Sequence, residues 1–162
     1  NAVDLNGLLY SYELWLEEAS QALGWGEDSI WQARAADRCE RVNRYLWNEA
    51  KGWFYDYDFI NEKQSEVRSL AGMLPLFSGL ATQEQAARVA ASIHELEREY
   101  GVAVTDDRPG CRNYQWAFPN AWPPLTYVTV EALRRNGQEV AAKRIAKKHL
   151  AVTRALFAKT GT

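Results

Sequence analysis

Several residue types are scarce in this chain, and each shortage excludes a class of protein. Only two cysteines occur in 162 residues, Cys39 and Cys111, and their spacing matches neither a metal site nor a disulfide framework. Nineteen Lys and Arg nearly balance 21 Asp and Glu, for a net charge of −2, so there is no basic field for nucleic acid. No apolar run approaches the ~20 residues that cross a bilayer, and the first residues show no signal pattern. The composition predicts a soluble chain that binds neither nucleic acid nor membrane.

What the chain does contain is enough apolar material for one domain. Of its 162 residues, 47% are hydrophobic, which is sufficient for a core of its own. The first residue is Asn1 rather than Met, from which we expect either a processed protein or a piece of something longer. Two free thiols favour a reducing compartment such as the cytoplasm.

Helical periodicity recurs six times along the chain. Apolar spacing predicts helices over residues 4–23, 29–46, 69–80, 82–101, 123–136 and 138–159. The first, third and fifth are relatively apolar, whereas the second, fourth and sixth are charged with a one-sided apolar stripe. This alternation predicts an all-α fold of about three hairpins, each with an inner and an outer helix, in a single domain over residues 1–162.

Several boundary signals support these helices. Asp4 is a possible N-cap of the first helix, and Ser29 with Gln32 and Thr82 with Gln85 are candidate capping boxes. Glycines end the helices, with Gly101 expected in a left-handed conformation after the fourth.

Between the second and third helices the pattern changes. Aromatic and polar residues alternate near 53–59, which predicts a short β-hairpin or an extended insertion.

The most informative stretch is residues 115–124, which read Gln-Trp-Ala-Phe-Pro-Asn-Ala-Trp-Pro-Pro. Prolines fix the backbone before a helix, so Gln115 and Trp116 are expected to be held stiffly. An indole face stacks on the C–H face of a pyranose while amides bond its hydroxyls. The stretch therefore indicates a sugar site. Core packing is the plainer interpretation for Trp122.

This decamer resembles a signature of the trehalase family of glycoside hydrolases. Residues 3–6, 45–48, 51–58 and 68–71 resemble further blocks of the same family, in the same order. Ala117 stands where the signature carries an aspartate. The resemblance implies an (α/α)6 toroid, of which this chain is about half. It also implies hydrolysis of an α-glucosidic bond with inversion, on a substrate such as trehalose, in either the cytoplasm or the periplasm and cell exterior.

In such a toroid the loops that precede the inner helices converge on one mouth. Candidate substrate-binding residues are therefore those just before the inner helices: Asp4, Asn6, Arg68, Gln115, Trp116 and Asn120. Plainer interpretations stay open, namely a helix cap for Asp4 and an ion-pair residue for Arg68.

Inverting hydrolysis requires two carboxyl groups about 6.5–9.5 Å apart, and no convincing pair stands out. Asp56 and Asp58 fit the solvated face of a hairpin, and Glu131 fits an ion pair within a helix. Asp106 and Asp107 lie among turn formers. The resemblance places the acid before residue 3 and the base beyond Thr162, so no catalytic residue is expected within the chain.

The sequence contains no motif for metal binding, phosphate binding or a covalent nucleophile. His94 and His149 lie far apart on charged helices, and there is no phosphate loop, no serine elbow and no Cys–His pattern. We expect no metal and no cofactor.

Two alternatives stay open: a non-catalytic carbohydrate-binding or scaffolding helical module, and a helical-repeat interaction protein. Half a toroid alone would expose apolar edges, so its partner is expected to be the rest of the parent toroid, or a second copy if isolated.

Overall fold

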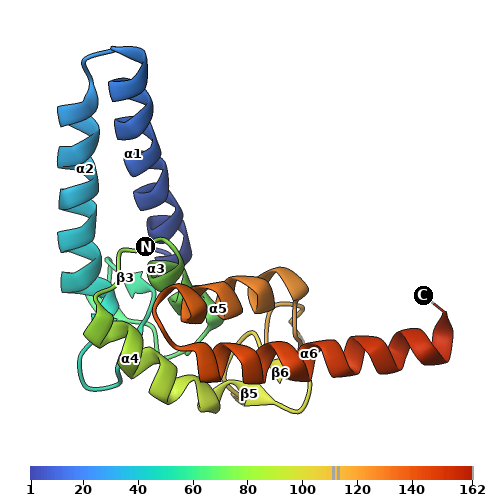
Figure 1. The fold of residues 1–162 in the computed structure, drawn as a ribbon. Coiled ribbons are helices and arrows are strands. Elements are labelled where there is room, and N and C mark those ends of the chain that lie inside the picture. Colours follow the sequence, from blue (N-terminus) through green and yellow to red (C-terminus); the bar gives the residue numbers. More distant parts are fainter. Residues whose placement is uncertain (111, 113, 162) are drawn as a thin grey trace.

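The described part of the chain forms six α-helices and three small β-hairpins (Figure 1). A computed structural model describes residues 1–110, 112 and 114–161. The helices are α1 (Val3–Leu23), α2 (Asp28–Arg41), α3 (Leu74–Phe77), α4 (Gln83–Ser92), α5 (Pro123–Arg135) and α6 (Glu139–Thr160). A π-helical turn, η1 (Val42–Leu46), extends α2; the 3-10 turns η2 (Leu70–Met73) and η3 (Ile93–Glu95) precede α3 and follow α4.

The strands are two residues long and pair as antiparallel hairpins. They are β1 (Trp47–Asn48) with β2 (Trp53–Phe54), β3 (Tyr57–Asp58) with β4 (Lys63–Gln64), and β5 (Glu97–Arg98) with β6 (Gly101–Val102). The predicted hairpin near residues 53–59 is therefore two successive hairpins. Trp47 lies opposite Phe54, and Tyr57 lies opposite Gln64.

The helices form an inner and an outer layer. Among the inner helices, α3 packs between α1 and α5, while α2 packs along α1 and α6 along α5. The first and third predicted pairs are thus helical hairpins. The middle pair differs, because α4 packs on β2 and η3.

Local signals place some helix ends correctly. The capping box of α4 forms as predicted: the Gln85 amide donates to Thr82 Oγ1 at 3.2 Å, and the Thr82 amide donates to Gln85 Oε1 at 2.9 Å. Gly24, with φ 65°, ends α1, and Gly137, with φ 74°, follows α5. These residues satisfy helix termini within one turn, so neighbours in sequence suffice to predict them.

Two boundary predictions for the outer helices are wrong. α2 begins at Asp28 after Glu27 with no side-chain cap, so Ser29 and Gln32 form no capping box. The helix predicted to end at Gly101 stops at Ser92, where the Ser92 hydroxyl bonds the Arg88 carbonyl at 2.8 Å and competes with the helical pattern. Gly101, with φ 118°, lies in β6.

The other boundary corrections concern the first and third helices. Asp4 is not the N-cap of α1, because the helix starts at Val3 after Ala2. The helix predicted over 69–80 is only η2 followed by α3, with Pro75 in the first turn of α3.

The core lies where the inner helices meet the β1–β2 hairpin. Its largest fully buried side chains include Trp53, Phe54, Leu70, Met73, Leu76, Leu133 and Ile145. Because β2 contributes two of these aromatic residues, the hairpin is part of the core rather than a surface insertion.

Two apolar edges are open, one on the inner helix α1 and one on the outer helix α6. One is a stripe along α1 at helical spacing, formed by the exposed residues Leu5, Leu8, Tyr12 and Trp15. The other is the last half of α6, which extends beyond the body (Figure 1) and exposes Leu150, Leu156 and Phe157. Contiguous apolar surface of this kind favours association with further polypeptide.

Glu97 fastens the β5–β6 hairpin to α6. Its side chain is 8% exposed and forms ion pairs with Arg144 at 2.9 Å and Lys148 at 2.7 Å. Burial by itself raises the pKa of Glu97, but hydrogen bonds from Arg144 and Lys148 outweigh it and hold that pKa below its ordinary value of 4.5. A lowered folded-state pKa stabilises the protein above the unfolded value, and this stability is lost as pH falls below it.

Glu97→Gln is therefore expected to cost about 1 kcal/mol of unfolding free energy near neutral pH. The difference from wild type should vanish as the pH falls well below 4.5, because Glu97 then protonates in both states. Denaturant unfolding of wild type and Glu97→Gln, from neutral pH to well below pH 4.5, measures this difference in unfolding free energy. Glu99→Gln is the matched control, since Glu99 is exposed nearby. If Glu97→Gln lost the same unfolding free energy at all pH values, the ion pairs of Glu97 would not be the cause.

Candidate functional site

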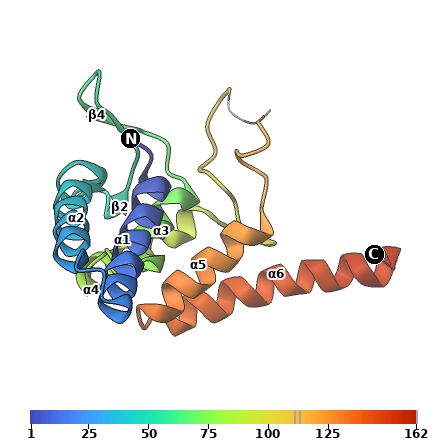
Figure 2. The same cartoon turned by 90° about the horizontal axis from the view of Figure 1, so that it is seen from above.

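Three segments rise on the same side of the inner layer, where α1 and α5 begin (Figure 2). They are the start of α1, the β3–β4 hairpin and the long loop before α5. We call this side the mouth, formed by residues 1–6 and 56–66 and by the described residues of the loop, 104–110, 112 and 114–122. It holds five of the six predicted substrate-binding residues, and Arg68 adjoins it in sequence.

Residues 114–122 form a compact ledge at the mouth. The Ala117 amide donates to the Tyr114 carbonyl at 3.2 Å, and the Asn120 amide donates to the Ala117 carbonyl at 2.9 Å. Trp122 Nε1 donates to the Gln115 carbonyl at 3.0 Å. These bonds close two turns and tie the far end of the ledge to its beginning, so the prediction of a stiffly held segment agrees with its hydrogen bonding.

The ledge presents an open indole. Trp116 stacks on Trp122 with ring centroids 4.7 Å apart and planes 16° from parallel, yet 54% of Trp116 is exposed. Gln115 beside it is exposed, and its side-chain amide has no hydrogen-bond partner in the described part of the chain. An indole supported from behind and a free amide are what a sugar ring requires.

Asn120 and Ala117 differ in exposure: Asn120 is exposed, whereas Ala117 is buried. Asn120 Nδ2 donates to the Tyr114 carbonyl at 3.2 Å, so one of its polar groups is already used. Ala117, at the position of the signature aspartate, is only 5% exposed. A larger side chain at residue 117 would therefore have to fit behind the ledge.

At the start of α1, Asp4 and Asn6 have different surroundings. Asp4 is exposed, and its Oδ1 accepts from the Leu5 amide at 2.7 Å. Asn6 donates to the Ala2 carbonyl at 2.8 Å and accepts from Arg38 Nη1 at 2.9 Å. Both polar atoms of Asn6 are thus occupied within the scaffold, whereas the Asp4 carboxylate is exposed.

Arg38 itself belongs to a network between α1 and α2. It binds both carboxylate oxygens of Glu13 at 2.7 and 2.8 Å, and Glu13 is 7% exposed. Paired in this way, the buried carboxylate holds the outer helix against the inner one.

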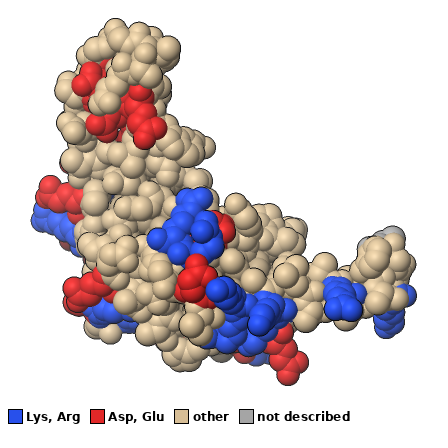
Figure 3. Space-filling view, in the orientation of Figure 1, with Lys and Arg blue, Asp and Glu red and all other residues tan. Residues whose placement is uncertain are grey.

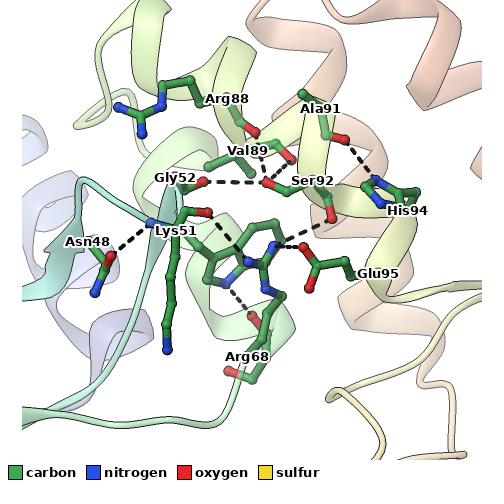
Figure 4. A network of polar contacts seen from close by, with 12 residues as sticks. Asn48, Lys51, Gly52, Arg68, Arg88, Val89, Ala91, Ser92, His94 and Glu95 are labelled. Carbon is green, nitrogen blue, oxygen red and sulfur yellow. Dashed lines mark hydrogen bonds and ion pairs between the residues drawn. The ribbon is translucent and has the colours of Figure 1, made fainter.

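Arg68 is buried in the scaffold, 6% exposed (Figure 4). Its guanidinium lies 4.8 Å from the Trp53 ring, pairs with Glu95 at 3.3 Å and faces the Ser92 carbonyl at 3.5 Å. The ion-pair interpretation describes these contacts. A sugar contact by Arg68 stays a prediction.

The carboxylates considered from sequence have ordinary partners. Asp56 accepts from the Val3 amide at 2.8 Å, which caps α1 from the β3 side. Hydrogen bonds from Asn61 hold the pKa of Asp58 below its usual value.

The remaining carboxylates are paired with arginines. Asp106 pairs with Arg108 at 3.0 Å, and Asp107 pairs with Arg112. A hydrogen bond from Arg134 lowers the pKa of Glu131. Each of these three carboxylates is thus held in an ion pair with an arginine.

Neither metal nor thiol chemistry is favoured by the described residues. They hold no cluster of His, Cys, Asp and Glu able to bind a metal. Cys39 is a free thiol whose Sγ lies 3.9 Å from the Leu80 carbonyl, and Cys111 lies outside the described residues. His94 Nδ1 lies 2.8 Å from the Ala91 carbonyl. No helix in the described ranges is long and apolar enough to span a membrane.

Comparison with known proteins decides the family. The sequence model of the family described as Trehalase matches residues 1–162. The chain belongs to the trehalase family. Periplasmic trehalase of Xanthomonas oryzae pv. oryzae is 37% identical over 158 residues, or 97% of this chain and 27% of that protein. Periplasmic trehalase of Salmonella newport is 38% identical over 145 residues, or 88% and 25%.

Solved structures confirm the predicted fold class. Neutral trehalase Nth1 from Saccharomyces cerevisiae matches this trehalase-family chain with a TM-score of 0.91 and 26% identity, over 99% of this chain and 32% of the other. A mannosylglycerate hydrolase from Thermus thermophilus matches with a TM-score of 0.81 at 21% identity, over 95% and 39%, and shows the fold alone. The chain is a segment of an (α/α)6 toroid that spans about a quarter to two fifths of the relatives it matches.

Proposed function

We propose that the complete protein containing this chain is a trehalase-like α-glucosidase that hydrolyses an α-glucosidic bond with inversion. The chain would supply part of the wall that binds the sugar and about half of the toroid. The observation that carries the proposal is the half-exposed indole of Trp116, stacked on Trp122 beside the free amide of Gln115. The names of the periplasmic trehalases support trehalose or a similar α-glucoside as the substrate.

Within this proposal the residues contribute unequally. Trp116 stacks on the ring, Gln115 bonds its hydroxyls, and Asp4 accepts from a hydroxyl at the opposite side of the mouth. Asn120 shapes the ledge, while Asn6 and Arg68 act from behind, since their polar atoms already bond the scaffold.

The two proton-handling carboxylates would come from parts of the protein outside residues 1–162. The pairing of Asp56, Asp58, Asp106, Asp107 and Glu131 within the scaffold supports this assignment. The apolar edges on α1 and α6 would receive the rest of the toroid, and an isolated chain would associate with itself.

Charge and compartment fit the same proposal. Cations gather along α6 and carboxylates toward the outer end of the α1–α2 hairpin (Figure 3), so neither sign dominates and no nucleic acid partner is proposed. The periplasmic relatives favour a compartment outside the cytoplasm for the complete protein, and they give no support to the cytoplasmic expectation.

The test is hydrolysis by the complete protein of a panel of α-linked glucosides that includes trehalose, with the released anomer followed by NMR. We expect glucose release with β-glucose appearing first from the hydrolysed bond, because a single displacement by water inverts the configuration. Binding of the sugars without any turnover would favour the non-catalytic binding module instead. Absence of both binding and turnover would exclude either function.

A further inference from the structure

Residues 104–106 form an extended segment between the approach to α3 and the ledge. On one side the Leu70 amide donates to the Val104 carbonyl and the Asp106 amide donates to the Arg68 carbonyl, both at 2.9 Å. On the other side the Val104 amide donates to the Asn120 carbonyl, also at 2.9 Å. The ledge is therefore fastened to the inner layer through this segment.

Thr105 adds a side-chain bond to this connection. Thr105 lies opposite Ser69 in an antiparallel bridge, whose two hydrogen bonds are those between Leu70 and Val104 and between Asp106 and Arg68. Its hydroxyl accepts from the Phe118 amide at 2.9 Å and donates to the Asp106 carbonyl at 3.1 Å. Because Thr105 is only 8% exposed, little water is available to replace that hydroxyl.

The bond reaches the ledge at Phe118, which has further contacts of its own. The Phe118 ring lies beneath the guanidinium groups of Arg98, at 5.1 Å, and Arg112, at 5.5 Å. The next carbonyl, of Pro119, accepts from the Tyr100 hydroxyl. Because Phe118 is only two residues after Trp116, the position of Phe118 constrains the position of the Trp116 indole.

We propose that Thr105 is a positioning residue, whose hydroxyl holds the Phe118 amide and thereby aims Trp116 and Gln115 at the sugar. The proposal rests on the proposed function of the ledge. Thr105 touches no substrate. Its effect is geometric, because a misplacement of about 1 Å in a binding group lowers catalytic rates by about 100-fold.

The experiment compares Thr105→Val with Thr105→Ser in the complete protein. Valine keeps the shape and removes the hydroxyl, whereas serine keeps the hydroxyl. Thr82→Val is the matched control: it also removes a hydroxyl that accepts from a backbone amide, but it lies at the start of α4, away from the mouth. Thr82→Val thus shows what the loss of such a hydroxyl does to the protein when it occurs away from the mouth, at an exposed position.

Two readouts are measured, and one of them does not depend on turnover. Amide hydrogen exchange across residues 114–120 should be about tenfold or more faster in Thr105→Val, and near wild type in Thr105→Ser and Thr82→Val. The value of kcat/KM for the α-glucoside should fall about 10- to 100-fold in Thr105→Val only. If Thr105→Val does not fold, Thr105→Ala against Thr105→Ser makes the same comparison of hydroxyl absent and present.

The outcomes separate this proposal from the function it rests on. Wild-type exchange in Thr105→Val, or a serine variant as impaired as the valine variant, would overturn the role of the hydroxyl. Faster exchange with unchanged kcat/KM would also overturn it, since the ledge would then move without consequence for the sugar. If the wild-type protein hydrolyses no α-glucoside, the proposed function fails, and the exchange data still decide whether Thr105 holds the ledge.

Discussion

Gly72→Ala is expected to destabilise the protein by at least about 3 kcal/mol, the largest stability effect we expect from adding one methyl group. A Cβ at residue 72 would lie 2.6 Å from the Phe54 carbonyl oxygen and closer still to Trp53 Nε1. Trp53 and Phe54 are 0% and 1% exposed, so neither can move aside without disturbing the core. Displacing Trp53 would also break its bond to the Ser69 carbonyl, 3.2 Å away.

Denaturant unfolding of the complete protein measures this effect, with Gly137→Ala as the matched control. Gly137 has φ 74° and no atom within 4 Å of its added Cβ, so alanine there costs only the left-handed strain, about 1–2 kcal/mol. If the denaturant midpoint of Gly72→Ala were equal to or higher than that of Gly137→Ala, β2 and η2 would not lie as close to each other as described.

Trp116→Ala in the complete protein is expected to lower kcat/KM for the α-glucoside about 10- to 100-fold. Without the indole, one large aromatic surface is no longer buried against the sugar, which costs ~1.5–3 kcal/mol. Each 1.4 kcal/mol corresponds to about a tenfold change in kcat/KM. Trp116→Phe should lose less, since it keeps an aromatic face. Initial rates across substrate concentrations give kcat and KM for each variant.

Trp25→Ala is the control for the loss of an exposed indole. Trp25 is 57% exposed against 54% for Trp116, but it follows α1 at the outer end of the α1–α2 hairpin, far from the mouth (Figure 1). Its kinetic constants should match wild type. Equal kinetics in Trp116→Ala and wild type would remove the indole from the binding wall.

Sequence predicted the helices whose ends are fixed locally. α1, α5 and α6 were predicted within about two residues, because glycines with positive φ and the two prolines at 123–124 act within one turn. The capping box of Thr82 and Gln85 is equally local. Alternation of apolar and charged helices predicted the layers, because each layer has its own contact with solvent.

What sequence could not predict depends on contacts between distant residues. The fourth helix stops at Ser92 because the chain turns into the β5–β6 hairpin, which Glu97 fastens to residues on α6. The helix predicted over 69–80 is reduced to η2 and α3, and within η2 Gly72 meets Trp53 and Phe54. No sequence pattern within either segment predicts that Glu97 contacts α6 or that Gly72 contacts Trp53 and Phe54.

In the candidate site, too, a local sequence pattern predicts some residues, whereas the surroundings of others depend on distant contacts. Gln115 and Trp116 stand out because aromatic, amide and proline residues are concentrated in one short stretch. Arg68 and Asn6 were selected by their place before inner helices, yet their polar atoms bond the scaffold. The roles of Thr105 at the ledge and of Asp56 at the start of α1 had no local signal, since their hydrogen bonds cross 13 and 53 residues of chain.

The most direct test of the sugar-binding ledge is a crystal structure of the complete protein with a thio-linked, non-hydrolysable α-glucoside. The account predicts a pyranose C–H face within ~4.5 Å of the Trp116 indole, on the side opposite Trp122, with a hydroxyl bonded to the Gln115 amide. A glucoside bound in the toroid with neither Trp116 nor Gln115 in contact would contradict it.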